Sequence, residues 1–96
     1  MTVVTIEYTL KFRNITGKDS EKIVLGDNAT IKQILEHLKR NYGDDFEKEF
    51  TNPSGDQIAG TPLILLNGQA LKLPENLNTN VEDGDIITFT YAIAGG

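Results

Sequence analysis

An alternation of apolar and polar side chains near the start of the chain constrains the fold more than any other feature. The even positions from Val4 to Phe12 carry Val, Ile, Tyr, Leu and Phe, and the odd positions between them carry Thr, Glu, Thr and Lys. A period of two puts every apolar side chain on one face of an extended strand. The run therefore predicts a half-buried strand. Because the chain has only 96 residues, we expect one domain in which this face packs on a single further layer.

The next segment predicts a partner for that strand. Residues 14–20 are rich in turn formers, and Glu21 to Leu25 is short and contains β-branched side chains. We therefore expect the chain to open with a β-hairpin.

A helix is predicted from about Ile31. Thr30 and Gln33 have the spacing of a capping box, and Gly43 is suited to end the helix in a left-handed conformation. Glu36 and Arg40 lie one turn apart on the outer side, where we expect an exposed ion pair. The apolar residues form one stripe, so the helix should pack on the sheet. This stripe consists of Ile31, Ile34, Leu35, Leu38 and Tyr42.

The segment after the helix is the least regular part of the chain. Phe46 and Phe50 are four residues apart and indicate one short helical turn. The turn-rich residues 52–55 then predict a loop.

Three further strands are predicted in the second half. Leu63 to Leu66 is apolar throughout, Asn67-Gly68 is a strong hairpin signal, and residues 69–71 return. A tight turn at 83–85 precedes a last strand at 86–92, in which alternate residues share one face. The expected order is β-β-α-β-β-β, an α+β domain with a mixed sheet packed on one main helix.

Charge and composition exclude several classes of protein. The chain has 9 basic and 14 acidic side chains, a net charge of −5, which disfavours nucleic acid and anionic membranes as partners. It has no cysteine, which excludes disulfides, thiolate nucleophiles and thiolate zinc sites. No segment approaches the roughly 20 apolar residues of a membrane span, and the first residues lack a signal-peptide pattern. We expect a cytoplasmic protein.

No catalytic or metal site can be assembled from the side chains. His37 lies off the apolar stripe and has no nucleophile at useful spacing, so we expect a solvated or structural role. Asp83 and Asp85 flank a glycine as turn formers. The acidic residues after the helix match no calcium loop and indicate a solvated cap. They are Asp44, Asp45, Glu47 and Glu49. The chain is also small for a deep substrate cavity, so we expect no enzyme and no bound metal or cofactor.

The last residues suggest a different kind of function. A strand of bulky residues runs into Ile93-Ala-Gly-Gly96, and glycine is a poor strand residue. The pair is either a frayed end or a thin thread that another protein's narrow channel can admit. We expect one domain over residues 1–96, with 92–96 as a flexible tail.

Several motifs resemble one known family over nearly the whole chain. Four stretches of the chain resemble the MoaD/ThiS ubiquitin-like sulfur carriers, and the resemblance is closest to the MoaD-type small subunit of molybdopterin synthase. The stretches are Leu63-Ile-Leu-Leu-Asn-Gly-Gln69, Leu77-Asn-Thr79, Val81-Glu-Asp-Gly-Asp-Ile-Ile87 and the closing Ala-Ile-Ala-Gly-Gly96. The resemblance implies a β-grasp fold with the last strand beside the first in the middle of the sheet.

It also implies a chemistry that needs no catalytic side chain of the carrier. A carboxylate resists nucleophiles at neutral pH, and in the family a ubiquitin-activating-type enzyme adenylates it with ATP and magnesium. Sulfur from a donor then replaces AMP and gives a thiocarboxylate, which a larger synthase subunit uses. By implication Gly96 carries the sulfur, Gly95 permits close approach, and Ile93 and Ala94 line the entry thread.

The apolar run in the second half is a candidate docking patch. Whichever alternation faces the helix, two large side chains of the run must point to the other face of the sheet. Such side chains are either covered by a loop or exposed to a partner. The run consists of Leu63, Ile64, Leu65 and Leu66.

The tail departs from the MoaD pattern, and three alternatives stay open. MoaD tails often carry two prolines where this chain has Tyr91 and Ala92, and the ending resembles ThiS, the sulfur carrier for thiamine thiazole synthesis. A second alternative is a protein modifier, whose activated carboxyl acylates a lysine to give an isopeptide bond. A third is a β-grasp interaction module with an idle tail.

Overall fold

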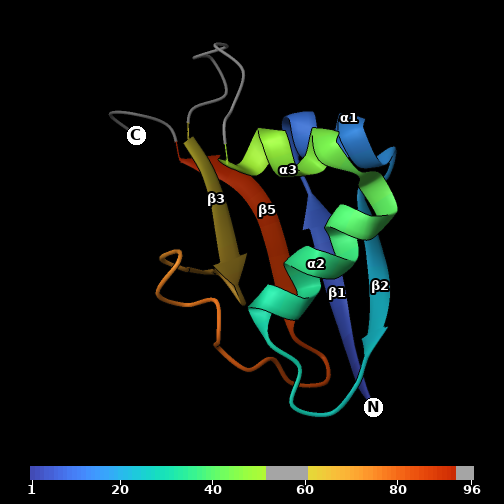
Figure 1. The fold of residues 1–96 in the computed structure, drawn as a ribbon, viewed down its shortest axis with the longest axis vertical. Helices are drawn as coiled ribbons and strands as arrows, with labels where there is room; N and C mark the ends of the chain where they lie inside the picture. The colour runs from blue at the N-terminus through green and yellow to red at the C-terminus, as the bar shows by residue number, and fades with distance from the viewer. Residues whose placement is uncertain (52–60, 93–96) are drawn as a thin grey trace.

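One mixed sheet carries the fold, with three helices on one of its faces (Figure 1). The computed structural model describes residues 1–51 and 61–92, excluding the side chains of residues 50, 51, 61 and 92. The spatial order of the strands is β2-β1-β5-β3-β4. The strands are β1 (Thr2–Tyr8), β2 (Ser20–Leu25), β3 (Thr61–Leu66), β4 (Gln69–Ala70) and β5 (Ile86–Ala92). The helices are α1 (Leu10–Thr16), α2 (Ile31–Tyr42) and α3 (Asp44–Thr51).

The predicted opening hairpin is only partly correct. β1 and β2 do pair antiparallel, but β1 ends at Tyr8 and α1 replaces the tight turn. Leu10 takes a positive φ of 50° and starts this helix, which buries Phe12 completely. Gly17 ends it in the left-handed conformation, with φ 74° and ψ 15°. The apolar alternation of the sequence continues beyond the end of β1 because Phe12 is also buried in the core, although it lies on α1 and not on the strand.

The main helix begins where it was predicted. The Gln33 backbone N–H donates to the Thr30 hydroxyl at 3.4 Å, and the Thr30 N–H donates to the Gln33 side-chain oxygen at 2.9 Å, so the capping box is complete. Gly43 has the expected positive φ of 75°, but its ψ of −157° is not left-handed helical. The chain turns there directly into α3, which is eight residues long and thus longer than the single turn predicted. The predicted element order gains two helices.

The central position of β5 agrees with the prediction. β5 runs parallel to β1 and antiparallel to β3. The hairpin between β3 and β4 turns at Asn67 and Gly68, whose φ values of 50° and 87° suit a primed turn. The tight turn before β5 closes through an Asp85 N–H donated to the Glu82 carbonyl at 3.0 Å.

The core lies between the sheet and the helices and is rich in aromatic rings. Phe46 on α3 packs 5.2 Å from Phe89 on β5 and 5.4 Å from Phe12 on α1, measured between ring centroids. α1 and α3 are thus held over the upper half of the sheet in Figure 1, where β5 ends. The end of the fold from which the tail would leave is therefore a well-packed one.

Candidate functional site

The strand that leads to the expected tail lies inside the sheet and is buried on its helix-facing side. Ile87, Phe89 and Tyr91 share the helix-facing side of β5, and all three are buried. β1 and β3 hold this strand from both sides. The residues that follow Ala92 therefore start from a fixed position in the middle of the sheet.

Tyr91 is held by two contacts from the helices. Its ring stacks on that of Phe12 with centroids 5.2 Å apart, and its hydroxyl donates to a Glu49 carboxylate oxygen at 2.8 Å. Burial raises the pKa of Tyr91, and the hydrogen bond to Glu49 raises it further. The hydroxyl therefore remains protonated and serves as a donor.

Glu49 is a residue whose role the sequence prediction missed. We expected it in a solvated acidic cap, but it is buried and bonded to Tyr91. The signal was its spacing, because Glu49 lies three residues after the buried Phe46 and so shares that face of α3. Of its neighbours, Asp44 and Asp45 are exposed in the first turn of α3, and Glu47 pairs with Lys39.

The expected tail residues, with the sulfur-carrying Gly96 at their end, lie outside the described part of the chain. These are Ile93, Ala94, Gly95 and Gly96. Their roles stay predictions.

The apolar run of β3 divides between the two faces of the sheet, as its length predicted. Ile64 is 2% exposed and lies opposite Phe89, and Leu66 lies opposite Ile87 and packs on the core. Leu63 and Leu65 alternate with them, pair with threonines of β5, and point to the face that carries no helix. Both are half-buried. The candidate docking patch is thereby narrowed to Leu63 and Leu65.

A neighbour extends this patch along the open face. Ile86 at the start of β5 is 41% exposed. It lies diagonal to Leu65, because Leu66 pairs with Ile87 and Leu65 with Thr88. The open face therefore has an apolar area that consists of Leu63 and Leu65 on β3 and Ile86 on β5.

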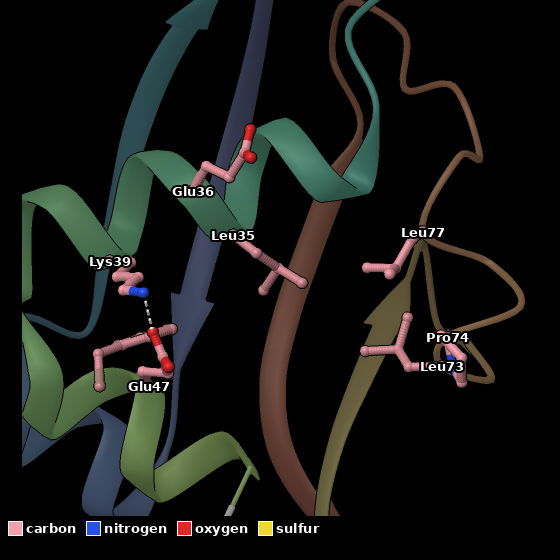
Figure 2. Close-up of a pocket in the computed structure, with 8 residues that line it drawn as sticks. Leu35, Glu36, Lys39, Glu47, Leu73, Pro74 and Leu77 are labelled. Carbon is pink, nitrogen blue, oxygen red and sulfur yellow. Dashed lines mark ion pairs between the residues drawn. The ribbon is translucent and has the colours of Figure 1, made fainter.

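The helix side contains one apolar pocket of about 300 Å³. Figure 2 shows Leu35 of α2 and Leu73 and Leu77 of the segment after β4 pointing into the same space. The ion pair between Lys39 and Glu47 lies at its rim. The pocket is formed by α2, α3 and the segment after β4, so it does not include β5, which leads to the expected tail.

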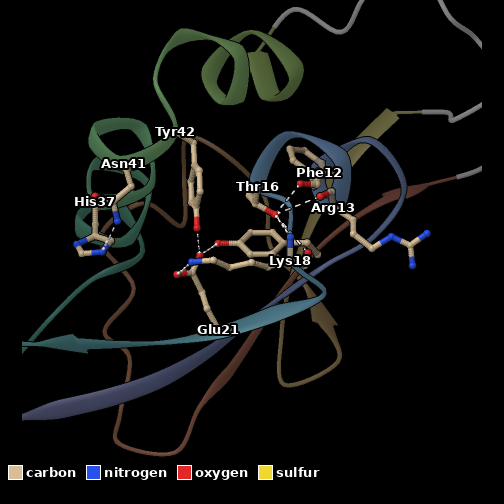
Figure 3. A network of polar contacts seen from close by, with 9 residues as sticks. Phe12, Arg13, Thr16, Lys18, Glu21, His37, Asn41 and Tyr42 are labelled. Atoms are coloured by element: carbon tan, nitrogen blue, oxygen red, sulfur yellow. Dashed lines mark hydrogen bonds and ion pairs between the residues drawn. The ribbon is translucent and has the colours of Figure 1, made fainter.

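A second polar cluster joins the start of β2 to the end of α2 (Figure 3). Glu21 accepts hydrogen bonds from the hydroxyls of Tyr8, at 2.6 Å, and Tyr42, and Lys18 lies 3.3 Å from its other oxygen. Burial alone would raise the pKa of Glu21, but the hydrogen bonds from Tyr42, Tyr8 and Lys18 outweigh it and leave this pKa lowered. Burial and then the bond to Glu21 raise the pKa values of both tyrosines. The cluster is a structural clamp.

The remaining candidate side chains have hydrogen-bond partners within the fold. His37 is half-buried and shares a 3.0 Å hydrogen bond with the Asn41 side chain. Asp83 accepts from the Val3 N–H at 2.8 Å, and Asp85 accepts from the Glu82 N–H at 2.8 Å. Asp85 therefore stabilises the turn before β5, as the sequence predicted, and Asp83 joins that turn to β1.

The match to a family model covers nearly the whole chain. The model of the ThiS family matches residues 6–96. Two curated relatives are similar over almost their full lengths. The sulfur carrier protein CysO of Mycobacterium tuberculosis is 27% identical over 93 residues, which cover 97% of this chain and 98% of that protein. A ubiquitin-related modifier 1 homolog of Caenorhabditis elegans is 23% identical over 95 residues, which cover 97% and 95%.

Solved structures share the fold. A Pyrococcus furiosus protein, provisionally assigned as molybdopterin converting factor subunit 1, superposes with a TM-score of 0.73 at 22% identity, covering 96% of this chain and all of that one. The small archaeal modifier protein 1 of Methanosarcina acetivorans gives 0.72 at 22% identity, covering 100% and 98%. A chain from the BexX/CysO complex of Amycolatopsis orientalis gives 0.65 at 22% identity, covering 97% and 99%.

The similarity to these solved structures confirms the predicted β-grasp architecture. Within residues 1–51 and 61–92, no helix is long and apolar enough to cross a bilayer. The match over residues 6–96 and the β-grasp sheet with a central last strand lead to one assignment. The chain belongs to the ThiS family of small ubiquitin-like sulfur carrier proteins.

Proposed function

We propose that the chain carries sulfur as a thiocarboxylate on Gly96. The observation that carries this proposal is the family match, which extends through residue 96 and so includes the closing glycines. The packing of β5 supports the proposal, because a fixed strand before the tail restricts where the reactive carboxylate can lie and so helps to position it in a partner's active site. Tyr91 fixes the end of β5 through its contacts with Glu49 and Phe12.

The chemistry divides between the chain and its partners. At neutral pH the Gly96 carboxylate is anionic and a poor acceptor for nucleophiles. A ubiquitin-activating-type partner with ATP and magnesium converts it to an acyl adenylate with release of pyrophosphate. The outer sulfur of a persulfide on a donor protein then attacks the acyl carbon and AMP leaves, which gives an acyl disulfide. A thiol of a partner protein attacks the donor sulfur of that disulfide, so the thiocarboxylate leaves on Gly96 and a disulfide forms on the partner side. Gly95 lets the thread approach the partner's backbone closely, and Ile93 and Ala94 line its entry.

The open face is the proposed docking surface for these partners. Leu63 and Leu65 offer apolar area beside β5, with Ile86 next to them. A partner bound there would receive the tail from the adjacent end of β5. The complex of CysO with BexX gives a precedent for a protein of this fold bound to another protein.

We propose molybdopterin synthesis as the destination of the sulfur. The motifs around Asn67-Gly68 and 81–87 support this destination, because they resemble the MoaD-type small subunit of molybdopterin synthase. A larger synthase subunit would then transfer the sulfur from Gly96 to the acceptor. The tail itself, without prolines at 91 and 92, favours a ThiS-like role in thiamine thiazole synthesis as the alternative.

A second candidate function rests on the relative from C. elegans, which is named a ubiquitin-related modifier. The same activated carboxyl would acylate a target lysine. Conjugates that disappear on deletion of Gly95 and Gly96 would support this function.

Intact-mass spectrometry tests the proposal. The chain is incubated with ATP, magnesium, a sulfur donor and the activating enzyme of its own genome. Exchange of one oxygen for sulfur adds about 16 Da. A variant lacking Gly96 is the matched control and should keep its mass. No change in the wild-type chain, with an enzyme shown to release pyrophosphate on a related carrier, would contradict the proposal.

A further inference from the structure

Asn67 joins two turns of the fold. It lies in the turn between β3 and β4, whereas Asp85 and Ile86 lie where the turn before β5 ends. The Asn67 backbone N–H donates to the Ile86 carbonyl at 2.8 Å, and the Ile86 N–H donates to Asn67 Oδ1 at 2.9 Å. Asn67 Nδ2 donates to Asp85 Oδ1 at 3.0 Å. Three hydrogen bonds therefore connect Asn67 to the second turn, and two of them use its carboxamide.

The sequence at this position is chemically reactive. Asn67 is the only asparagine of the chain that is followed by glycine. A backbone nitrogen that follows asparagine can attack the side-chain carbonyl carbon, and glycine favours this attack because it has no Cβ to hinder the approach. Both Asn67 and Gly68 are exposed, so water also reaches the site.

The reaction needs no co-reactant other than water. The Gly68 nitrogen gives up its proton and bonds to Asn67 Cγ, the Cγ–Nδ2 bond breaks, and ammonia leaves with that proton. Water then opens the resulting five-membered imide at one of its two carbonyls. The products are aspartate and isoaspartate, and in isoaspartate the main chain gains one carbon. Each product carries a carboxylate in place of the carboxamide and is about 1 Da heavier.

The folded structure restrains this reaction. Asn67 and Gly68 form a primed turn, with φ values of 50° and 87°. Ring closure removes the Nδ2 donor and draws Asn67 Cγ onto the Gly68 nitrogen, so the side chain must leave Asp85 and Ile86. β4 is only two residues long, and a short hairpin of this kind opens at a low cost in free energy. Local opening of the hairpin therefore controls the rate.

Deamidation replaces the bond between Asn67 and Asp85 by a repulsion. The Nδ2 donor becomes a carboxylate oxygen beside Asp85 Oδ1, while Asp85 Oδ2 still accepts from the Glu82 N–H at 2.8 Å. Two carboxylates this close repel each other. In isoaspartate the added backbone carbon also changes the two-residue turn that sets the register of β3 and β4. Both products therefore weaken the connection between this hairpin and β5.

We propose that Asn67 is a deamidation site, and that its modification separates the β3–β4 hairpin from the turn before β5. The three bonds of Asn67 slow the reaction in the folded chain, so the reaction marks chains whose hairpin has opened. Ile86 belongs to the apolar area of the open face, so a modified chain should also dock more weakly there. This last consequence rests on the proposed function, whereas the experiments below use no partner protein and can fail independently of it.

Ageing of the full chain tests the site and its protection. The chain and the peptide acetyl-LLNGQA-amide are incubated together at mildly alkaline pH, and fragmentation locates each modified asparagine. Asn67 should react first, and about tenfold more slowly in the folded chain than in the peptide, because the hairpin must open. The deamidated fraction is separated by its additional negative charge, and the unmodified fraction of the same sample is the control. The deamidated fraction should unfold at a lower urea concentration and exchange its Ile86 amide faster.

A charge swap isolates the contact with Asp85. Asn67→Asp should unfold at a lower urea concentration, because it places two carboxylates together. Combining it with Asp85→Asn exchanges donor and acceptor at unchanged net charge and should restore most of the loss. Asn78→Asp, at an exposed asparagine after β4, is the charge-matched control and should unfold like the wild type.

Four results would overturn the proposal. The first is that another asparagine reacts before Asn67 or that Asn67 stays intact. The second is that Asn67 reacts as fast in the folded chain as in the peptide. The third is that the deamidated and unmodified fractions unfold at the same urea concentration, and the fourth is that the double variant is no more stable than Asn67→Asp.

Discussion

At the scale of single residues, two carboxylates accept hydrogen bonds from tyrosines, and each joins a strand of the sheet to a helix. Glu21 joins β2 to α2 through Tyr8 and Tyr42. Glu49 joins α3 to the root of the tail through Tyr91. The spacing of Glu49 from Phe46 does indicate its burial, but the tyrosine partner of neither carboxylate could be predicted from the local sequence. Their partners are 13 to 42 residues away in the sequence, and only the tertiary fold brings them together.

The first prediction concerns Glu21 and pH. Its pKa is lowered in the folded chain, so its contribution to stability is present above the unfolded value near 4.3 and is lost as pH falls through the folded pKa. Glu21→Gln should lower the free energy of unfolding by about 1–2 kcal/mol at pH 7. Urea denaturation should show the wild-type and variant curves converging towards pH 3. A difference that stayed constant with pH would show that the carboxylate charge has no role.

The second prediction concerns Tyr91. Tyr91→Phe leaves the buried Glu49 carboxylate without its donor and should cost about 1–3 kcal/mol of unfolding free energy. Glu49→Gln keeps an acceptor and should cost less. The double variant should be less destabilised than the sum of the two, since the two side chains contact each other. Strict additivity in denaturant titrations would argue against the contact.

At the scale of elements, sequence patterns predicted the pieces that carry their own signals. The capping box at Thr30, the primed turn at Asn67-Gly68 and the last strand all have local chemistry that fixes their bounds. α1 was missed because Leu10 and Phe12 continue the alternation of β1. Phe12, Ile15 and Gly17 did carry a helical spacing and an end signal, but the strand pattern overlapped them.

The third prediction tests the start of α2. Thr30→Ala removes the acceptor for the Gln33 N–H and should lower the stability of the fold by about 1 kcal/mol. Thr30→Ser retains the hydroxyl and should stay close to wild type. Thermal unfolding of the three chains checks this, and equal midpoints would show that the cap contributes nothing.

At the scale of the whole molecule, the fold separates three tasks in space. The helices and the inner face of the sheet form the core, the open face offers Leu63 and Leu65, and the central strand leads to the tail. The division of the run from Leu63 to Leu66 was predictable, because a strand must alternate its side chains. Which two residues face outward depended on the register with β5, which the sequence did not reveal.

The fourth prediction places docking on that open face. Leu65→Glu should leave the fold intact and weaken binding to the activating enzyme at least tenfold, because a charge would be buried against the partner. Leu10→Glu, an exposed apolar position on α1, is the matched control and should bind normally. Surface plasmon resonance with the enzyme immobilised compares them. Equal affinities for both variants would move the docking surface elsewhere.

The most direct measurement for the central claim is fragment mass spectrometry of the charged chain. After incubation with the activating enzyme, ATP and a sulfur donor, the thiocarboxylate is alkylated and the C-terminal peptide is sequenced by fragmentation. The account predicts that the sulfur and its alkyl group lie on Gly96 alone and are absent when ATP is omitted. Sulfur on any other residue, or incorporation that does not need ATP, would contradict it.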